Sequence, residues 1–178
     1  LASSRDYLNQ FVRLRTDPQQ TLSEEYTVEF FLSSRVRPEA LREVYYAFDR
    51  ADLLPESTPA LETLYQLLTD NPEIKIRLTA HTDRRGTASY NARLSQQRAE
   101  SVVRYLIGRG IAPERLEAMG RGSDEPYTVT KRTAAVHPFL AVGTVLTPDF
   151  IASLSSPEEQ AVCDQLNRRT AFEVRATP

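Results

Sequence analysis

The sequence predicts an α/β two-layer sandwich, a mixed sheet with helices packed on one face. Several short segments alternate apolar and polar residues, as strands buried on one side do. Between them lie two longer segments whose apolar residues recur every three or four positions, as in amphipathic helices. The order strand, helix, strand, helix, strand and strand predicts crossover helices on one face of the sheet.

The first strand of the sheet is predicted just before residue 50. Its apolar side chains alternate and it stops at two charged residues: Val44, Tyr46 and Phe48, then Asp49 and Arg50. A helix then begins at Thr58, which can cap it, and Pro59, which suits the first helical position. Its buried face is formed by Leu61, Leu64, Tyr65 and Leu68. Asn71-Pro72 ends this helix, because the residue before a proline disfavours the helical conformation.

The next strand has the cleanest two-residue period in the chain. Its inward side chains are Ile74, Ile76, Leu78 and Ala80. A long helix at about 89–107 follows, and Gly108 and Gly110 end it because glycine accepts the left-handed conformation. The buried stripe of this helix is Leu94, Val102, Val103 and Leu106. Two shorter strands complete the sheet, one at 116–119 and one where Thr170, Phe172 and Val174 alternate.

We expect one domain at residues 44–178, preceded by an N-terminal extension at 1–43. An appended strand is predicted in the extension, where Val28, Phe30 and Leu32 alternate with more polar neighbours. A helical segment is inserted into the domain at about 129–166. Two helix starts are predicted inside this insertion: Thr147-Pro148, and Ser156-Pro157 with a capping box from Ser156 to Glu159.

Composition limits the possible partners. The chain has 22 Lys and Arg against 24 Asp and Glu, so its net charge of -2 offers no positive field for a nucleic-acid backbone. No apolar run approaches the roughly 20 residues that cross a bilayer, so any membrane tether is expected outside this sequence. Cys163, His81 and His137 are too few for a His/Cys-rich metal site, and we expect no cofactor. The oligomeric state stays open.

Polar residues concentrate where the second strand ends and the long helix begins. Their order is His81-Thr82-Asp83, Gly86, Asn91, Leu94-Ser95 and Arg98-Ala99. This pattern resembles the OmpA C-terminal-like family of peptidoglycan-binding domains (OmpA, MotB and Pal), whose signature reads H-T-D-x-x-G, N-x-x-L-S and R-A. Three weaker matches extend the resemblance over about 44–174, with the insertion left aside: Phe48-Asp49, Gly120-Arg121-Gly122 and Asn167-Arg168-Arg169.

The resemblance implies a non-covalent site for the diaminopimelate residue of the peptidoglycan stem peptide. The side-chain end of this amino acid carries both an ammonium and a carboxylate. By similarity Asp83 would bind the ammonium and Arg98 the carboxylate, which a guanidinium fork matches better than a lysine does. The resemblance assigns supporting roles in the same pocket to Asn91, Thr82, Arg168, Phe48 and Asp49.

The implied protein is a non-catalytic module that anchors an outer-membrane or envelope protein to the cell wall, in the periplasm of a diderm bacterium. Two other functions stay open from the residues. A cell-wall hydrolase would need an activated water or a nucleophile, for which the chain offers neither a His/Asp metal cluster nor a suitable Cys-His pair. A protein-interaction domain would dock a partner on the insertion. His81 and Ser95 are interpreted as structural residues.

Overall fold

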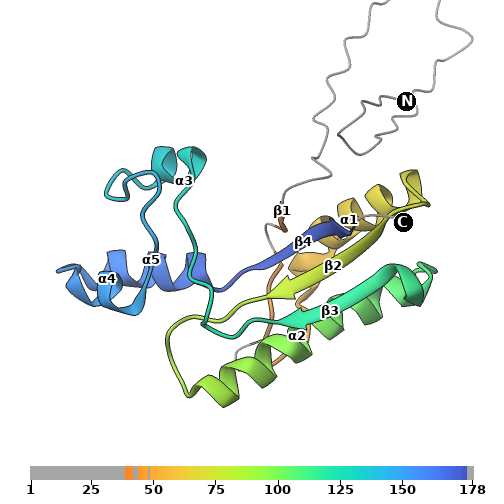
Figure 1. Cartoon of the computed structure of the whole chain (residues 1–178), viewed down its shortest axis with the longest axis horizontal. Helices are drawn as coiled ribbons and strands as arrows, with labels where there is room; N and C mark the ends of the chain where they lie inside the picture. Colours follow the sequence, from red (N-terminus) through yellow and green to blue (C-terminus); the bar gives the residue numbers. More distant parts are fainter. Residues whose placement is uncertain (1–38, 42–43, 48, 176–178) are drawn as a thin grey trace, which may run out of the picture.

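The computed structural model describes residues 39–41, 44–47 and 49–175, which form a single twisted sheet with helices beside it (Figure 1). Four strands lie side by side in the order β1 (Glu39–Leu41), β4 (Thr170–Arg175), β2 (Lys75–Ala80) and β3 (Leu116–Gly120). β2 and β3 are parallel, whereas β4 is antiparallel to both β1 and β2. The predicted mixed sheet is therefore confirmed, while the predicted strand around Val28 and the residue Phe48 lie outside the described residues.

Two helices pack on one face of this sheet, α1 (Thr58–Asp70) and α2 (Ala88–Gly108). α2 forms the crossover between the parallel strands β2 and β3. The main core consists of side chains from both helices, from β2 and β4, and from the residues just before β2 and just after α2: Leu61, Leu64, Leu68, Ile74, Ile76, Leu78, Val102, Leu106, Ile111 and Phe172. The intervening β2 residue Arg77 faces the other way, where its guanidinium pairs with Glu117 at 2.9 Å and Glu173 at 3.1 Å.

The strand predicted at Val44 and Tyr46 is wrong in the part that the structure describes. Tyr46 forms only an isolated bridge with Leu53, and the edge strand paired to β4 comes earlier, at β1. The backbone of Tyr45 is instead hydrogen-bonded to Ser57. Its N–H donates to the Ser57 hydroxyl at 2.7 Å, and that hydroxyl donates to the Tyr45 carbonyl at 2.9 Å. Val44 and Tyr46 do pack against the core, so their alternation reflects packing without sheet pairing.

The start of α1 differs in one detail from the prediction. The helix begins at Thr58, and the capping position belongs to Ser57, whose side chain makes no capping hydrogen bond. A short 3-10 turn, Pro55–Ser57, precedes the helix and brings Ser57 to Tyr45. The predicted cap at Thr58 is therefore wrong by one residue, whereas the buried face of the helix is confirmed.

The glycine turn after β3 packs directly on α2. A side chain at Gly120 would place a Cβ 2.3 Å from the backbone nitrogen of Gln96 and 2.6 Å from the Ser95 hydroxyl, so only glycine fits. Gly122 has a positive φ of 53° and donates its N–H to the Ser95 hydroxyl at 2.9 Å. Ser95 is fully buried, which explains its place in the N-x-x-L-S motif as a structural residue.

The segment predicted to be an insertion contains three helices, α3 (Lys131–Val136), α4 (Pro148–Ser153) and α5 (Pro157–Asn167), which extend beyond one end of the sheet (Figure 1). They enclose a second, smaller core: Val129, Leu140, Leu146, Ile151 and Cys163. The predicted starts of α4 and α5 are confirmed, because Thr147 and Ser156 accept hydrogen bonds from the backbone of the first turns. Within the described ranges, no helix is long and apolar enough to span a bilayer.

Candidate functional site

The motif loop 81–87 leaves the carboxyl end of β2 and is held on three sides. The backbone N–H of His81 donates to the carbonyl of Arg169 at 2.9 Å, and that of Thr82 donates to Gly122 at 2.8 Å. Asn91 reaches up from the first turns of α2, and its amide donates to the Arg85 carbonyl at 2.8 Å. These bonds fix the loop between the sheet, the glycine turn and α2.

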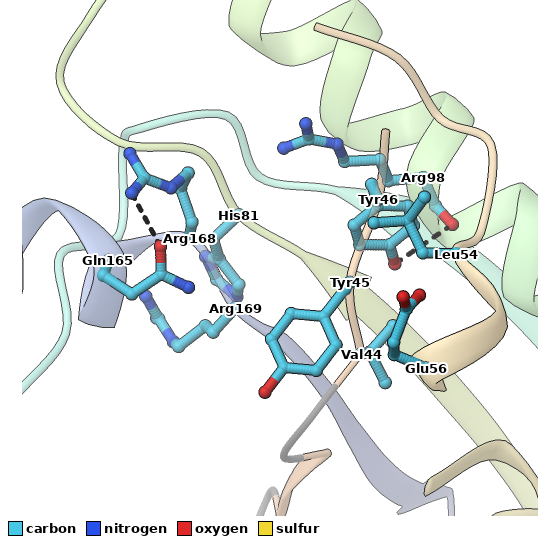
Figure 2. A pocket seen from close by; sticks show the side chains of 10 residues that line it. All are labelled: Val44, Tyr45, Tyr46, Leu54, Glu56, His81, Arg98, Gln165, Arg168 and Arg169. Carbon is cyan, nitrogen blue, oxygen red and sulfur yellow. Dashed lines mark hydrogen bonds between the residues drawn. The ribbon is translucent and has the colours of Figure 1, made fainter. Parts of the chain in front are cut away.

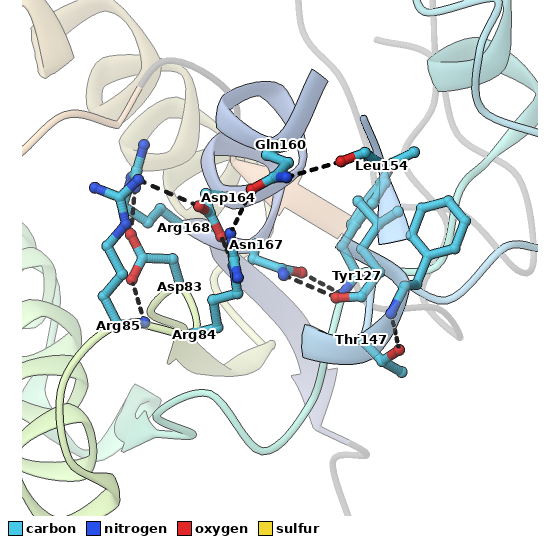
Figure 3. Close-up of polar contacts among 12 residues, drawn as sticks. Asp83, Arg84, Arg85, Tyr127, Thr147, Leu154, Gln160, Asp164, Asn167 and Arg168 are labelled. Atoms are coloured by element: carbon cyan, nitrogen blue, oxygen red, sulfur yellow. Dashed lines mark hydrogen bonds and ion pairs between the residues drawn. The ribbon is translucent and has the colours of Figure 1, made fainter. Parts of the chain in front are cut away.

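Asp83 lies at the centre of this loop with little of its surface exposed, 9% of the residue. Its Oδ1 accepts a hydrogen bond from the backbone N–H of Arg85 at 2.9 Å. Its Oδ2 accepts one from Nη1 of Arg168, the residue that follows α5, and the two form an ion pair (Figure 3). Asp83 is thus already paired with an arginine in the free protein.

Arg98 approaches the same region from the middle of α2. Its Nε donates to the carbonyl of Arg50 at 3.0 Å, and its guanidinium carbon lies 4.9 Å from the centre of the Tyr46 ring. Among the residues that the structure describes, Nε is the only atom of this guanidinium with a hydrogen bond, which leaves both terminal nitrogens available. Burial lowers the pKa of Arg98, with a further contribution in the same direction from Arg168, but arginine remains charged at any physiological pH.

Tyr46 supports Arg98 from below. Its hydroxyl shares a hydrogen bond of 2.8 Å with that of Thr170, at the start of β4. Burial raises the pKa of Tyr46 to about 12, so the ring stays neutral and offers its face to the guanidinium. The alternation of Val44, Tyr46 and Phe48 predicts a strand and gives no sign of this contact between Tyr46 and Arg98.

A cavity of about 390 Å³ opens beside Arg98 and Arg168 (Figure 2). Arg98 extends from α2 toward the side of the cavity on which Arg168 and His81 lie. The remaining walls are a mixture of apolar and polar side chains: Val44, Tyr45, Tyr46, Leu54, Glu56, Gln165 and Arg169. The cavity therefore offers a ligand three arginines, Arg98, Arg168 and Arg169, together with aliphatic and aromatic side chains and the carboxylate of Glu56.

The structure places the predicted site residues in different roles. Arg98 and Arg168 line the cavity, whereas Asp83 is not one of its lining residues and is connected to it by its ion pair with Arg168. Asn91 is buried beneath the loop, and its amide nitrogen is already used by the carbonyls of Arg85 and, at 3.4 Å, Asp83. Thr82 is also buried, and its hydroxyl has no hydrogen-bond partner among the described residues.

Asp49 lies at the rim of this region. It has a left-handed backbone with φ of 55°, and its exposed carboxylate accepts a hydrogen bond from the hydroxyl of Tyr90 on α2. Its neighbour Phe48 lies outside the described residues. Of the Phe48-Asp49 pair noted in the sequence, the structure therefore places only Asp49.

His81 lines the cavity, although no ligand role was expected for it. Its ring is almost fully buried, 4% of the residue being exposed, and its Nδ1 has no hydrogen-bond partner in the described part of the chain. Burial, together with the charges of Arg169 and Arg121, lowers the pKa of His81 from 6.5 to about 3. The imidazole is therefore neutral at physiological pH. Its position directly before Thr82-Asp83 is the sequence signal that could have placed it at the site.

The fold and this constellation define the chain as a member of the OmpA family. A family model described as the OmpA family matches residues 45–137, and the resemblance noted in the motifs is confirmed. Outer membrane protein A of Shimwellia blattae is 41% identical over 88 residues, which are 48% of this chain and 36% of that protein. The peptidoglycan-associated lipoprotein of Pseudomonas aeruginosa is 35% identical over 99 residues, 56% of this chain and 58% of that protein. The chain thus spans less than two thirds of these relatives.

Two solved structures share the fold. The peptidoglycan-associated lipoprotein from Burkholderia pseudomallei superimposes with a TM-score of 0.52 at 25% identity, covering 74% of this chain and 88% of that one. A MotB-like protein from Desulfovibrio vulgaris gives a TM-score of 0.52 at 26% identity, covering 78% of this chain and 71% of that one.

Within the described residues, no three His, Cys, Asp or Glu side chains lie together in a way that could hold a metal ion.

Proposed function

We propose that this chain binds peptidoglycan without covalent chemistry, through the diaminopimelate residue of the stem peptide. The observation that supports this most is an acid, Asp83, that is ion-paired with one arginine of the cavity, Arg168, while a second arginine, Arg98, lines the same cavity. The Asp83 side chain is 12% exposed, and the terminal nitrogens of Arg98 have no partner among the described residues. Such an arrangement suits a ligand that carries both charges at one end.

The ammonium of the ligand would bind to Asp83, joining or replacing Arg168 at Oδ2. Its carboxylate would bind to the two terminal nitrogens of Arg98, where two parallel hydrogen bonds are possible. Charge-assisted hydrogen bonds of this kind contribute about 1.5–3 kcal/mol each, so these two contacts would dominate the affinity. Tyr46 and the carbonyl of Arg50 hold the arginine in place, which limits the entropy lost on binding.

The relatives support the same proposal. The name of the Pseudomonas aeruginosa protein states an association with peptidoglycan, as does that of the Burkholderia pseudomallei protein with the same fold. Outer membrane protein A of Shimwellia blattae is an outer-membrane protein by name. By analogy we place this chain in the periplasm of a diderm bacterium, where it would anchor an outer-membrane or envelope protein to the cell wall and break no bond.

Co-sedimentation with purified sacculi tests this function. We expect the wild-type chain to pellet with diaminopimelate-containing sacculi and the variants Asp83→Ala and Arg98→Ala to remain in the supernatant. Matched controls are Asp149→Ala and Arg104→Ala, because these residues lie at exposed positions outside the cavity lining. Unchanged pelleting of both site variants, with circular dichroism showing that they are folded, would remove the site assignment. Release of soluble muropeptides during incubation would instead favour a hydrolase.

A further inference from the structure

The inserted helix α5 presents a polar stripe to the loop that carries Asp83. Gln160 and Asp164 lie four residues apart on one face of α5, and Arg168, four residues further on, directly follows the end of the helix. These three residues form the stripe. Arg168 donates to Asp83 itself. Asp164 and Gln160 both contact Arg84, the loop residue that follows Asp83. Figure 3 shows the contacts of Asp164 beside the ion pair between Arg168 and Asp83.

Asp164 is the central member of this stripe and is almost completely buried, 1% of the residue being exposed. Its Oδ1 accepts a hydrogen bond from Nε of Arg84 at 3.1 Å, and its Oδ2 lies 3.5 Å from Nη2 of Arg85. A buried carboxylate is costly unless it is paired. Both of its partners belong to the loop, immediately after Asp83, so the insertion and the loop depend on each other.

Arg84 makes a two-pronged contact with the stripe. While its Nε binds Asp164, its Nη2 donates to Oε1 of Gln160 at 3.1 Å. Only a guanidinium can span both acceptors in this way, since a lysine ammonium is a single point charge. The contact fixes the direction in which the chain leaves Asp83.

From these contacts we infer that Asp164 is a positioning residue for the ligand site, acting through Arg84 and Arg85 on Asp83. This rests on the proposed function, because the readout of positioning is the affinity for diaminopimelate. Asp164 is 1% exposed and its two carboxylate oxygens are engaged by Arg84 and Arg85, so we assign it no direct contact with the ligand. Asp164 on α5 and Arg168 at the end of α5 both contact the loop around Asp83, so α5 is a structural part of the proposed site.

The variants Arg84→Lys and Asp164→Asn test this inference with little change in size. Arg84→Lys keeps the charge near the site and loses only the two-pronged geometry. Arg77→Lys is the matched control, because Arg77 makes a comparable double contact with Glu117 and Glu173 on the outer face of the sheet. We expect Arg84→Lys and Asp164→Asn to bind diaminopimelate roughly tenfold more weakly, equivalent to about 1.4 kcal/mol, and Arg77→Lys to bind as the wild type does.

Amide hydrogen exchange supplies a readout that needs no ligand. The N–H of Arg85 donates to Asp83, so loosening of the loop should accelerate its exchange in Arg84→Lys and Asp164→Asn while the amides of β2 keep their protection. Unchanged exchange in the loop, or faster exchange with unchanged affinity, would overturn the inference. If the wild-type chain binds no diaminopimelate at all, the proposed function fails, and the exchange result alone decides whether Asp164 holds the loop.

Discussion

Arg168 donates a hydrogen bond from its Nη1 to Oδ2 of Asp83, although the two residues are 85 positions apart in the chain. The same arginine donates from Nη2 to Gln165 at 2.7 Å, which fixes its guanidinium at the end of α5. The acid of the site is therefore neutralised before any ligand arrives. In the proposed function, the ammonium of the ligand shares Asp83 with Arg168, and the carboxylate of the ligand meets a cavity that is lined by both Arg98 and Arg168.

Replacing Arg168 by glutamine should weaken the binding of diaminopimelate by about tenfold, because the acid loses its orienting partner and the cavity loses one of its positive charges. Titration calorimetry with the free amino acid measures this. Arg175→Gln, the same change at the far end of β4, serves as control and should leave the affinity unaltered. Tighter binding of Arg168→Gln would show that Arg168 competes with the ligand and does not assist it.

Gly120→Ala should lower the free energy of unfolding by about 1–3 kcal/mol, since the new Cβ would overlap the backbone of Gln96. The natural comparison is Gly108→Ala at the end of α2, where no atom lies within 4 Å of the added Cβ. In Gly108→Ala the free energy of unfolding should rise by about 0.5–1 kcal/mol, because alanine favours the helix more than glycine does. Denaturant unfolding of both variants gives the two values, and equal effects would contradict the close packing of the glycine turn on α2.

The neutral, buried His81 should make stability depend on pH. Its pKa is about 3 in the folded chain against 6.5 as the ordinary value, so between these pH values the unfolded chain binds a proton that the folded chain does not. This contribution to stability is complete above pH 6.5 and is lost progressively as the pH falls, by at most about 1.4 kcal/mol per pH unit. Urea unfolding at pH 7, 6 and 5 should show a steeper loss for the wild type than for His81→Gln. Parallel curves for the two proteins would contradict a neutral His81.

The sequence correctly predicts those helices and strands in which apolar residues recur at a regular spacing along the whole segment. β2 and α2 show this best, because each buries one face over many residues and its pattern has no second interpretation. β1 has only three residues, too few for an alternation to appear. α3 has only six residues, fewer than two helical turns, and its cap at Thr130 was not predicted.

The candidate site could be predicted only for residues that belong to the motifs. Asp83 and Arg168 lie near one another because the sheet brings the end of β2 beside the start of β4, whereas Arg98 reaches the cavity from α2. The walls around them could not be predicted. Tyr45 and Tyr46 reach the cavity through an irregular segment, whose course is set by Ser57 and not by any periodic pattern.

Calorimetric titration with diaminopimelate and with Nα-acetyl-lysine amide tests the central claim most directly, because this blocked lysine keeps the side-chain ammonium but has no carboxylate. Wild-type protein should bind diaminopimelate at least about tenfold more tightly than the blocked lysine, the equivalent of one lost charge-assisted contact. In Arg98→Lys this preference should shrink, since the fork that receives the carboxylate is gone. Equal affinity of the wild-type chain for both compounds, or an undiminished preference in Arg98→Lys, would contradict the assignment of Asp83 and Arg98 as the two halves of the site.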